Sequence, residues 1–267
     1  MKHVSILGCG WLGFPLAKSL VAKGFSVSGS TTSFEKISAL ENQGIQSFLI
    51  ELFEEKINGD IASFLQETDV LIVDIPPKLR STSSENFVAK IETLLAQIEK
   101  SQVKKVIFIS SISVYADDNS VITEETIPNP ETESGKQLLQ AEQLLQQNQY
   151  FQTTVIRFGG LIGTNRHPVF HLAGKQNLQN PKAPVNLIEL QDCIGIIEAV
   201  ISKNCFSETF NAVTPFHPSR KDYYTQKATA FGLPLPEFDD SKQSVGKTII
   251  STKITTVLDY HFQNQTL

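Results

Sequence analysis

Three glycines near the N-terminus have the spacing of a phosphate-binding turn. They are Gly8, Gly10 and Gly13, placed between a short apolar run, Val4–Leu7, and a helical pattern. The first glycine allows a sharp bend, the second lets a pyrophosphate approach the backbone, and the third lets the helix pack against the strand. The free N–H groups and partial positive charge of the helix start then attract phosphate. The pattern predicts a dinucleotide site, and a glycine turn without a ligand is the alternative.

The end of the expected second strand indicates which dinucleotide fits. An acidic residue about twenty positions beyond the glycines normally binds the ribose 2′-OH of NAD. Here the strand ends in Ser30, Thr31 and Thr32 without a carboxylate, and Lys36 follows in the next helix. Hydroxyls and a lysine can bind the 2′-phosphate of NADP, although the better partner, arginine, is absent. The pattern favours NADP over NAD, and hydroxyls that only cap the next helix are the alternative explanation.

The turn opens an alternating series of strands and helices. Apolar runs alternate with amphipathic segments through the first 160 residues, which predicts an α/β fold with a doubly wound parallel sheet, the Rossmann fold. The expected strands are Val4–Leu7, Phe25–Gly29, Gln46–Ile50, Val70–Asp74, Val106–Ser110 and Thr154–Phe158. One helix is expected to end near Ala22, and others to cover Ser33–Asn42, Gly59–Gln66, Glu85–Lys100 and Gly135–Gln147.

The pattern changes after residue 160. Residues 1–160 are predicted to form the dinucleotide-binding core, and residues 161–267 to add sheet strands and a small substrate-binding lobe. The later elements are expected at Asp192–Ser202 (helix), Thr209–Val213 (strand), Ser219–Phe231 (helix) and Lys247–Phe262 (a short strand and a last helix). Ligands of open α/β sheets bind beyond the carboxyl ends of the strands, so we expect the lobe to cover the cofactor.

Composition narrows the class of protein. The 267 residues are 40% hydrophobic and 19% charged, as in ordinary globular proteins. A net charge of −5 without a basic stripe argues against nucleic acid as a partner. The three cysteines, Cys9, Cys193 and Cys205, form neither a disulfide framework nor a metal-ligand pattern, so no metal is expected. No apolar run has the length of a signal peptide or a membrane span, and we expect a cytoplasmic protein.

Several segments together resemble the NAD(P)-dependent epimerase/dehydratase family, the extended short-chain dehydrogenase/reductases. Residues 107–115, IFISSISVY, are similar to that family's fifth strand with its S-S-x-x-V-Y ending. Residues 157–163, RFGGLIG, are similar to the segment after the sixth strand that approaches the nicotinamide. Residues 185–192 and 210–213 are similar to parts of the substrate lobe. The resemblance implies an NAD(P)-dependent oxidoreductase or epimerase.

The motif and the resemblance together give a set of site residues. The expected cofactor contacts are Gly8, Gly10, Trp11, Leu12, Gly13, Ser30, Thr31, Thr32, Ile75, Pro76, Ser110, Phe158 and Gly159. The family's catalytic residues are a serine on the fifth strand and a Tyr–Lys pair on one helix face, where the lysine lowers the tyrosine pKa. Ser111 stands at the serine position, but Ser134 and Leu138 stand at the Tyr and Lys positions. This departure is typical of the epimerase-like branch that lacks the pair.

Two other residues are candidates for moving the proton. Tyr115 lies one turn beyond Ser111, where a structural tyrosine is the plainer interpretation. His167 follows the sixth strand and can titrate near neutral pH, although an exposed loop histidine is the plainer interpretation. One hypothesis is an NADP-dependent enzyme acting on a small carbonyl compound or a sugar nucleotide, as a monomer or homodimer. The other is a non-catalytic NADP(H)-binding regulator or sensor.

Overall fold

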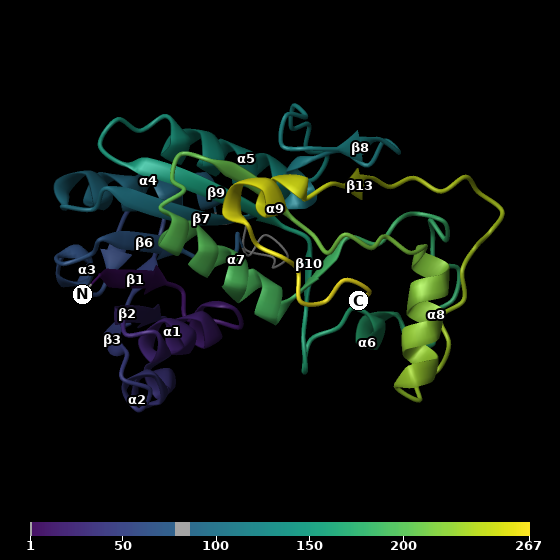
Figure 1. The fold of residues 1–267 in the computed structure, drawn as a ribbon, viewed down its shortest axis with the longest axis horizontal. Helices are drawn as coiled ribbons and strands as arrows, with labels where there is room; N and C mark the ends of the chain where they lie inside the picture. The colour runs from purple at the N-terminus through teal and green to yellow at the C-terminus, as the bar shows by residue number, and fades with distance from the viewer. Residues whose placement is uncertain (1, 78–85) are drawn as a thin grey trace.

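The computed structural model describes residues 2–77 and 86–267. At its centre lies a seven-stranded sheet in which all neighbouring strands are parallel, with the order β12-β9-β7-β6-β1-β2-β3 (Figure 1). The strands are β1 (His3–Leu7), β2 (Ser26–Thr31), β3 (Gln46–Leu49), β6 (Val70–Val73), β7 (Lys105–Ser111), β9 (Gln152–Phe158) and β12 (Thr209–Ala212). The predicted doubly wound parallel sheet is confirmed.

Helices cover both faces of this sheet. One face carries α1 (Gly13–Ala22), α7 (Leu190–Lys203) and α9 (Thr252–Leu258), and the other carries α3 (Ile61–Leu65), α4 (Phe87–Lys100) and α5 (Glu133–Gln146). The side chains of strand β6 alternate between the two cores that these helices form. Val70 and Ile72 pack into the first core, and Leu71 and Val73 pack into the second. A strand buried on both faces needs apolar side chains at every position, which explains the unbroken apolar run.

The chain order of the sheet reverses at β1, which lies between β2 and β6. Ligands of open α/β sheets bind at such a reversal, outside the carboxyl ends of the strands. The loops that follow β1, β2 and β6 therefore meet at one place. The glycine turn is the first of these loops.

Two long helices begin at side-chain caps. The Asn86 side chain accepts a hydrogen bond from the Ala89 N–H at 3.1 Å, and the Thr132 hydroxyl accepts one from the Gly135 N–H at 3.1 Å. Such caps satisfy N–H groups that a helix start leaves unpaired. The expected helices α4 and α5 are confirmed, although the expected first residue of α4, Glu85, lies outside the described residues.

The helix expected over Ser33–Asn42 differs from the structure. A 3₁₀ turn at Phe34–Lys36 precedes a short helix, α2 (Ile37–Glu41). The Ser33 side chain caps neither element. The first turn is instead closed by a backbone bond from the Lys36 N–H to the Ser33 carbonyl oxygen at 3.1 Å, which gives the tighter 3₁₀ geometry.

The chain after β9 builds a lobe at the right-hand side of Figure 1. It contains β10 (Gly160–Ile162), α6 (Val169–Leu172), β11 (Leu187–Glu189) and α8 (Arg220–Ala230). Tyr223 and Tyr224 belong to a small apolar core of its own. Strand β12 joins the central sheet, as expected of the C-terminal part. A boundary at residue 160 remains a prediction.

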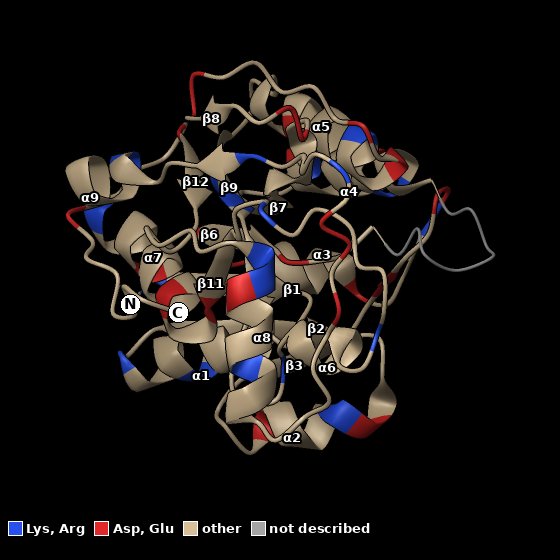
Figure 2. Cartoon of the chain, turned by 90° about the vertical axis from the view of Figure 1, so that its right-hand side faces the viewer, with Lys and Arg blue, Asp and Glu red and all other residues tan. Residues whose placement is uncertain are grey.

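Two short strand pairs connect loops at the edge of the core. Strand β8 (Val121–Ile122) pairs in parallel with β13 (Thr248–Ile249), and β4 (Glu51–Leu52) forms an antiparallel pair with β5 (Ile57–Asn58). In Figure 2, basic and acidic residues both lie along α8. Over residues 2–77 and 86–267, no helix has the length and apolar character needed to cross a membrane.

Candidate functional site

Two of the three glycines in the turn are required by the backbone itself. Gly8 has a φ of +108°, and a Cβ atom there would lie 2.2 Å from the Asp74 carbonyl oxygen. A Cβ atom at Gly13 would lie 2.2 Å from the Gly8 carbonyl oxygen. Only glycine fits either position, so α1 starts directly against the ends of β1 and β6.

Gly10, by contrast, faces open space. No heavy atom lies within 4 Å of the place its Cβ would take. The backbone N–H groups of the next two residues, Trp11 and Leu12, donate to no other residue in the described parts of the chain. Unpaired N–H groups at a helix start attract anions, and the space at Gly10 admits one.

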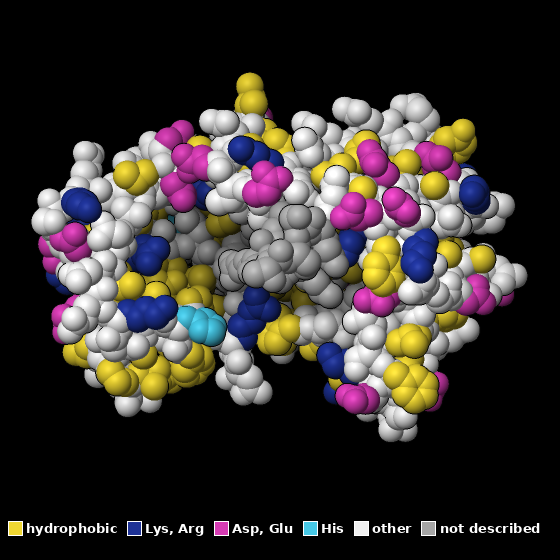
Figure 3. Space-filling model, turned by 180° about the vertical axis from the view of Figure 1, so that it is seen from behind, with side chains coloured by type: hydrophobic (Ala, Val, Ile, Leu, Met, Phe, Trp, Pro, Cys, Tyr) yellow, Lys and Arg dark blue, Asp and Glu magenta, His cyan; other side chains and the backbone are white. Residues whose placement is uncertain are grey.

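A cavity of about 200 Å³ opens beside this turn. The predicted residues that line it are Gly8, Gly10, Ser30, Thr31, Thr32, Ile75 and Pro76, together with Lys36. The other predicted contacts, which do not belong to this lining, are Trp11, Leu12, Gly13, Ser110, Phe158 and Gly159. Figure 3 shows the face turned away in Figure 1, where a hollow contains hydrophobic and basic side chains.

The apolar wall of the cavity was not identified from sequence. Ile50, Leu52 and Phe87 form part of it. They come from the end of β3, from β4 and from the start of α4, and only the order of the sheet brings them together. An apolar wall opposite hydroxyls and a lysine suits a nucleoside with a phosphate group.

The hydroxyls at the end of β2 differ in their availability. The Ser30 hydroxyl accepts a hydrogen bond from the Gly8 N–H at 2.9 Å, and the Thr31 hydroxyl accepts one from the N–H two residues later at 3.1 Å. Thr32 and Lys36 are exposed, and within the described chain neither side chain has a hydrogen bond or an ion pair. These two side chains are free to bind a ligand.

Asp74 is the polar residue at this site that sequence patterns assigned only to capping. It follows β6, and its carboxylate accepts a hydrogen bond from the Gly13 N–H at the start of α1. Burial raises the pKa of Asp74 to about 7, while the Gly13 N–H and the Arg166 charge act in the lowering direction. A carboxyl group that titrates near neutral pH therefore lies directly under the glycine turn.

The three positions of the family's catalytic residues differ in burial and contacts. Ser111 ends β7, and its hydroxyl accepts a hydrogen bond from the Ser113 N–H at 3.2 Å. Ser134 is half-buried in the first turn of α5 and makes no side-chain hydrogen bond within the described residues. Leu138 is buried in the core between α5 and the sheet. An acid or a cation is thus absent from both positions where the family has its Tyr–Lys pair.

Tyr115 belongs to a buried polar network instead of an open surface. Arg157 donates to both carboxylate oxygens of Glu142, at 3.2 Å and 2.6 Å to Oε2 and 3.1 Å to Oε1, and donates to the Tyr115 hydroxyl at 2.6 Å. The Tyr115 hydroxyl donates in turn to Asn211 at 3.0 Å, and Ser110 donates to Glu142 at 2.5 Å. Burial raises the Tyr115 pKa. The network joins α5, β7, β9 and β12 inside the protein.

His167 is buried, so the expectation of an exposed loop histidine is wrong. Its Nδ1 accepts the Val169 N–H at 3.1 Å, which places the ring proton on Nε2, and Nε2 donates to the Tyr223 hydroxyl at 2.9 Å. The ring also stacks on Tyr223 at 5.6 Å between ring centroids. Burial, with a smaller effect of the nearby Lys227 charge, lowers the His167 pKa to about 4, so the ring is neutral near pH 7. The packing of α6 on α8 explains the difference.

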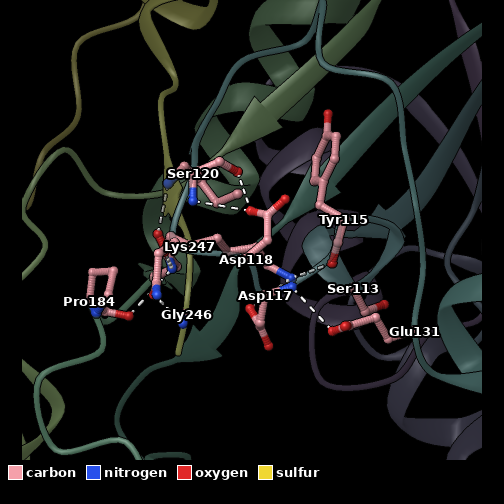
Figure 4. A network of polar contacts seen from close by, with 12 residues as sticks. Ser113, Tyr115, Asp117, Asp118, Ser120, Glu131, Pro184, Gly246 and Lys247 are labelled. Carbon is pink, nitrogen blue, oxygen red and sulfur yellow. Dashed lines mark hydrogen bonds and ion pairs between the residues drawn. The ribbon is translucent and has the colours of Figure 1, made fainter. Parts of the chain in front are cut away.

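Lys247 connects the C-terminal tail to the loop after β7 (Figure 4). Its ammonium group donates to the Tyr115 carbonyl oxygen at 2.6 Å and pairs with Asp117 at 3.2 Å. The Asp117 N–H donates to Glu131 at 3.2 Å. These contacts fix the loop beyond Ser111, and no sequence pattern had identified them.

Cys9 is a packing residue in the glycine turn. Its sulfur would lie 2.6 Å from a Cβ at Gly29, so the two residues fit only as a pair. Burial, followed by the nearby Asp74 charge, raises the pKa of the Cys9 thiol to about 12. The thiol is protonated at neutral pH and is not a nucleophile.

Comparisons with known proteins agree with this geometry. Residues 8–186 match the model of a family described as NAD(P)H-binding. Protein YeeZ of Escherichia coli strain K12 is 34% identical over 98% of this chain and 96% of its own. An uncharacterized UDP-glucose epimerase, YtcB, of Bacillus subtilis strain 168 is 24% identical over 68% of this chain and 65% of its own. The structure of a UDP-glucuronic acid 4-epimerase from Bacillus cereus, in complex with UDP-glucuronic acid and NAD, has a TM-score of 0.81 at 20% identity and covers 98% of this chain and 95% of that one.

Proposed function

The chain belongs to the NAD(P)H-binding family, with the fold of the epimerases and dehydratases, and from this premise we propose that it is an NADP(H)-dependent enzyme. Its proposed substrate is a small carbonyl compound or a sugar nucleotide. The observation that carries the proposal is the cavity beside the glycine turn, which combines open space at Gly10, an apolar wall and the unpaired cation of Lys36.

The free side chains at the end of β2 support NADP over NAD. Thr32 can donate a hydrogen bond and Lys36 a charge to a 2′-phosphate, and no carboxylate stands at the strand end to repel it. NAD is the alternative, because Glu51 lines the same cavity and its carboxylate can accept a ribose hydroxyl. The two cofactors are distinguished by removing the Lys36 charge.

Calorimetric titration tests the cofactor. We expect Lys36→Ala to weaken NADPH binding by about tenfold, the loss of one charge-assisted hydrogen bond, and to leave NADH binding unchanged. Lys100→Ala, which removes an exposed cation at the far end of α4, serves as the matched control. Equal affinity of wild type and Lys36→Ala for NADPH, or tighter binding of NADH, would favour NAD.

Ser111 is the proposed contact with substrate. The nicotinamide, when bound, supplies or accepts a hydride. We assign to the Ser111 hydroxyl, at the carboxyl end of β7, a hydrogen bond to the substrate oxygen whose carbon exchanges that hydride, and the proton of that oxygen would exchange with water. The Tyr115 and His167 side chains have partners inside the protein, so the proposal gives neither a contact with substrate. The sugar nucleotide class rests on the relatives, one of which binds UDP-glucuronic acid.

Turnover separates this enzyme from a sensor. With NADPH and a panel of carbonyl compounds and sugar nucleotides, Ser111→Ala should lower kcat by about a hundredfold while NADPH affinity stays unchanged. Ser202→Ala on α7 is the matched control. The second candidate, a non-catalytic NADP(H) sensor, is favoured by the buried Leu138 at the lysine position. Tight NADPH binding without turnover on any substrate of the panel would support the sensor.

A further inference from the structure

Arg166 is carried by the lobe but lies against the glycine turn. It closes a tight loop after β10, in which Gly163 and Arg166 exchange backbone hydrogen bonds of 2.9 Å and 3.0 Å. Its guanidinium carbon lies 4.9 Å from the centre of the Trp11 ring. Trp11 is the residue that directly follows the open Gly10. The lobe therefore contacts the turn through a cation stacked on an aromatic ring.

The loop is shaped to hold this contact. A Cβ atom at Gly163 would lie 3.0 Å from the Trp11 ring, so glycine at this position lets the ring pack against the loop backbone. The ring fills the space between the lobe and the start of α1. Arg166 then covers the Trp11 ring.

The guanidinium group has donors to spare. Within the described residues the Arg166 side chain makes the contact with Trp11 and neither a hydrogen bond nor an ion pair. Its charge is close enough to the turn to act on the Asp74 carboxyl group beneath it. An exposed arginine with free N–H groups beside a phosphate-binding turn has the chemistry to bind phosphate as a fork.

We propose that Arg166, held by Trp11, binds the pyrophosphate of the dinucleotide and closes the lobe over it. The proposal rests on the cofactor site described under Proposed function. The Trp11 and Leu12 N–H groups would donate to the pyrophosphate from the helix side, and the guanidinium would donate from the lobe side. The guanidinium would bring a full positive charge to the pyrophosphate from the lobe side, whereas the helix start supplies only a partial positive charge. The 2′-phosphate would lie apart from Arg166, at Thr32 and Lys36, which line the cavity while Arg166 does not.

Ligand fragments separate these two phosphate subsites. ADP-ribose contains the pyrophosphate without a 2′-phosphate, and adenosine 2′-monophosphate contains the 2′-phosphate without a pyrophosphate. In calorimetry, Arg166→Ala should weaken ADP-ribose and NADPH binding by about tenfold and leave adenosine 2′-monophosphate binding unchanged. Lys36→Ala should weaken adenosine 2′-monophosphate binding and leave ADP-ribose binding unchanged. Arg166→Lys, which keeps the charge but not the fork, should recover part of the ADP-ribose affinity.

Lys175→Ala is the matched control, because it removes an exposed cation from the same lobe without a contact at the turn. If Arg166→Ala leaves ADP-ribose affinity unchanged while wild type binds NADPH, the proposed role of Arg166 at the pyrophosphate is wrong and the proposed function stands. Loss of UDP binding without loss of ADP-ribose binding would assign Arg166 to a substrate diphosphate and also overturn its role at the pyrophosphate. Absence of NADPH, NADH and ADP-ribose binding by wild type would reject the proposed function and the role of Arg166 together.

Discussion

The turn between β1 and α1 and the first turns of α5 lie at the same edge of the sheet, but their residues are constrained in different ways. At the turn, backbone atoms 2.2 Å from each would-be Cβ exclude any side chain at Gly8 and Gly13. On α5, Ser134 makes no side-chain hydrogen bond within the described residues, and Leu138 is an ordinary core residue. The glycine geometry typical of a phosphate-binding turn is present, while the positions of the family's acid and base hold a half-buried serine and a core leucine.

The buried ion pair of α5 lies one turn beyond Leu138. Glu142 forms a buried ion pair with Arg157, and the two side chains are 1% and 6% exposed. A buried pair with full hydrogen bonding fixes the position of a helix on its sheet. The glycine turn and the Tyr–Lys pair are therefore separable features of this fold, since the first is present in a chain whose α5 carries neither residue of the pair.

The largest expected effect is at the turn. Gly8→Ala combines a φ of +108° with a backbone clash, and should lower the free energy of unfolding by about 4 kcal/mol. Gly24→Ala is the control, because Gly24 also has a positive φ but has open space around it, and should cost about 1 kcal/mol. Urea unfolding measures both. Equal losses would show that the turn is less crowded than the structure indicates.

The next largest effect concerns α5. Glu142→Gln leaves the Arg157 charge buried without its partner, and should lower the free energy of unfolding by about 3 kcal/mol. Asp240→Asn breaks the exposed pair with Lys221 and should cost less than about 1 kcal/mol. Each of the two variants, if it folds, should bind NADPH with the affinity of wild type. Loss of NADPH affinity in Glu142→Gln would link the network to the cofactor site and break the contrast between the two regions.

A pH dependence of intermediate size is expected from Asp74. Its pKa in the folded protein is about 7, above the ordinary 3.8, so the folded state holds the proton more tightly than the unfolded state. The free energy of unfolding should then fall as pH rises from about 4 to about 7, and the loss should be complete above pH 7. Asp74→Asn should be more stable than wild type at pH 8 and should have a flatter profile of thermal unfolding against pH. Parallel profiles for the two proteins would contradict the assigned pKa.

The smallest effect is expected at Ser134, which stands where the family has its catalytic tyrosine. Ser134→Ala should change the free energy of unfolding by less than about 0.5 kcal/mol, because the side chain has no partner within the described residues. NADPH affinity and any turnover of this variant should stay within about twofold of the wild-type values. A loss of turnover with unchanged NADPH affinity would identify Ser134 as a catalytic group.

Local signals in the sequence were sufficient for the sheet, for the helices α4 and α5 and for the glycine turn. The apolar run at Val70–Val73 and the glycine spacing are short-range patterns with one structural meaning. The positions of Asp74 and Arg166 relative to the turn were not predictable, because they depend on which strands are neighbours and on how the lobe folds back. His167 shows the same limit, since its burial comes from α8, more than fifty residues further along the chain.

Calorimetric titration of wild type and Gly10→Val with NADPH tests the central claim most directly. Gly10 has no neighbour within 4 Å of its would-be Cβ, so the valine variant should keep the thermal stability of wild type while filling the room for the pyrophosphate. We predict saturable binding to wild type, accompanied by a change in the fluorescence of Trp11, the only tryptophan, and a loss of at least about tenfold in the variant. Equal binding by both proteins, or binding of neither NADPH nor NADH by wild type, would contradict the assignment of the glycine turn as the cofactor site.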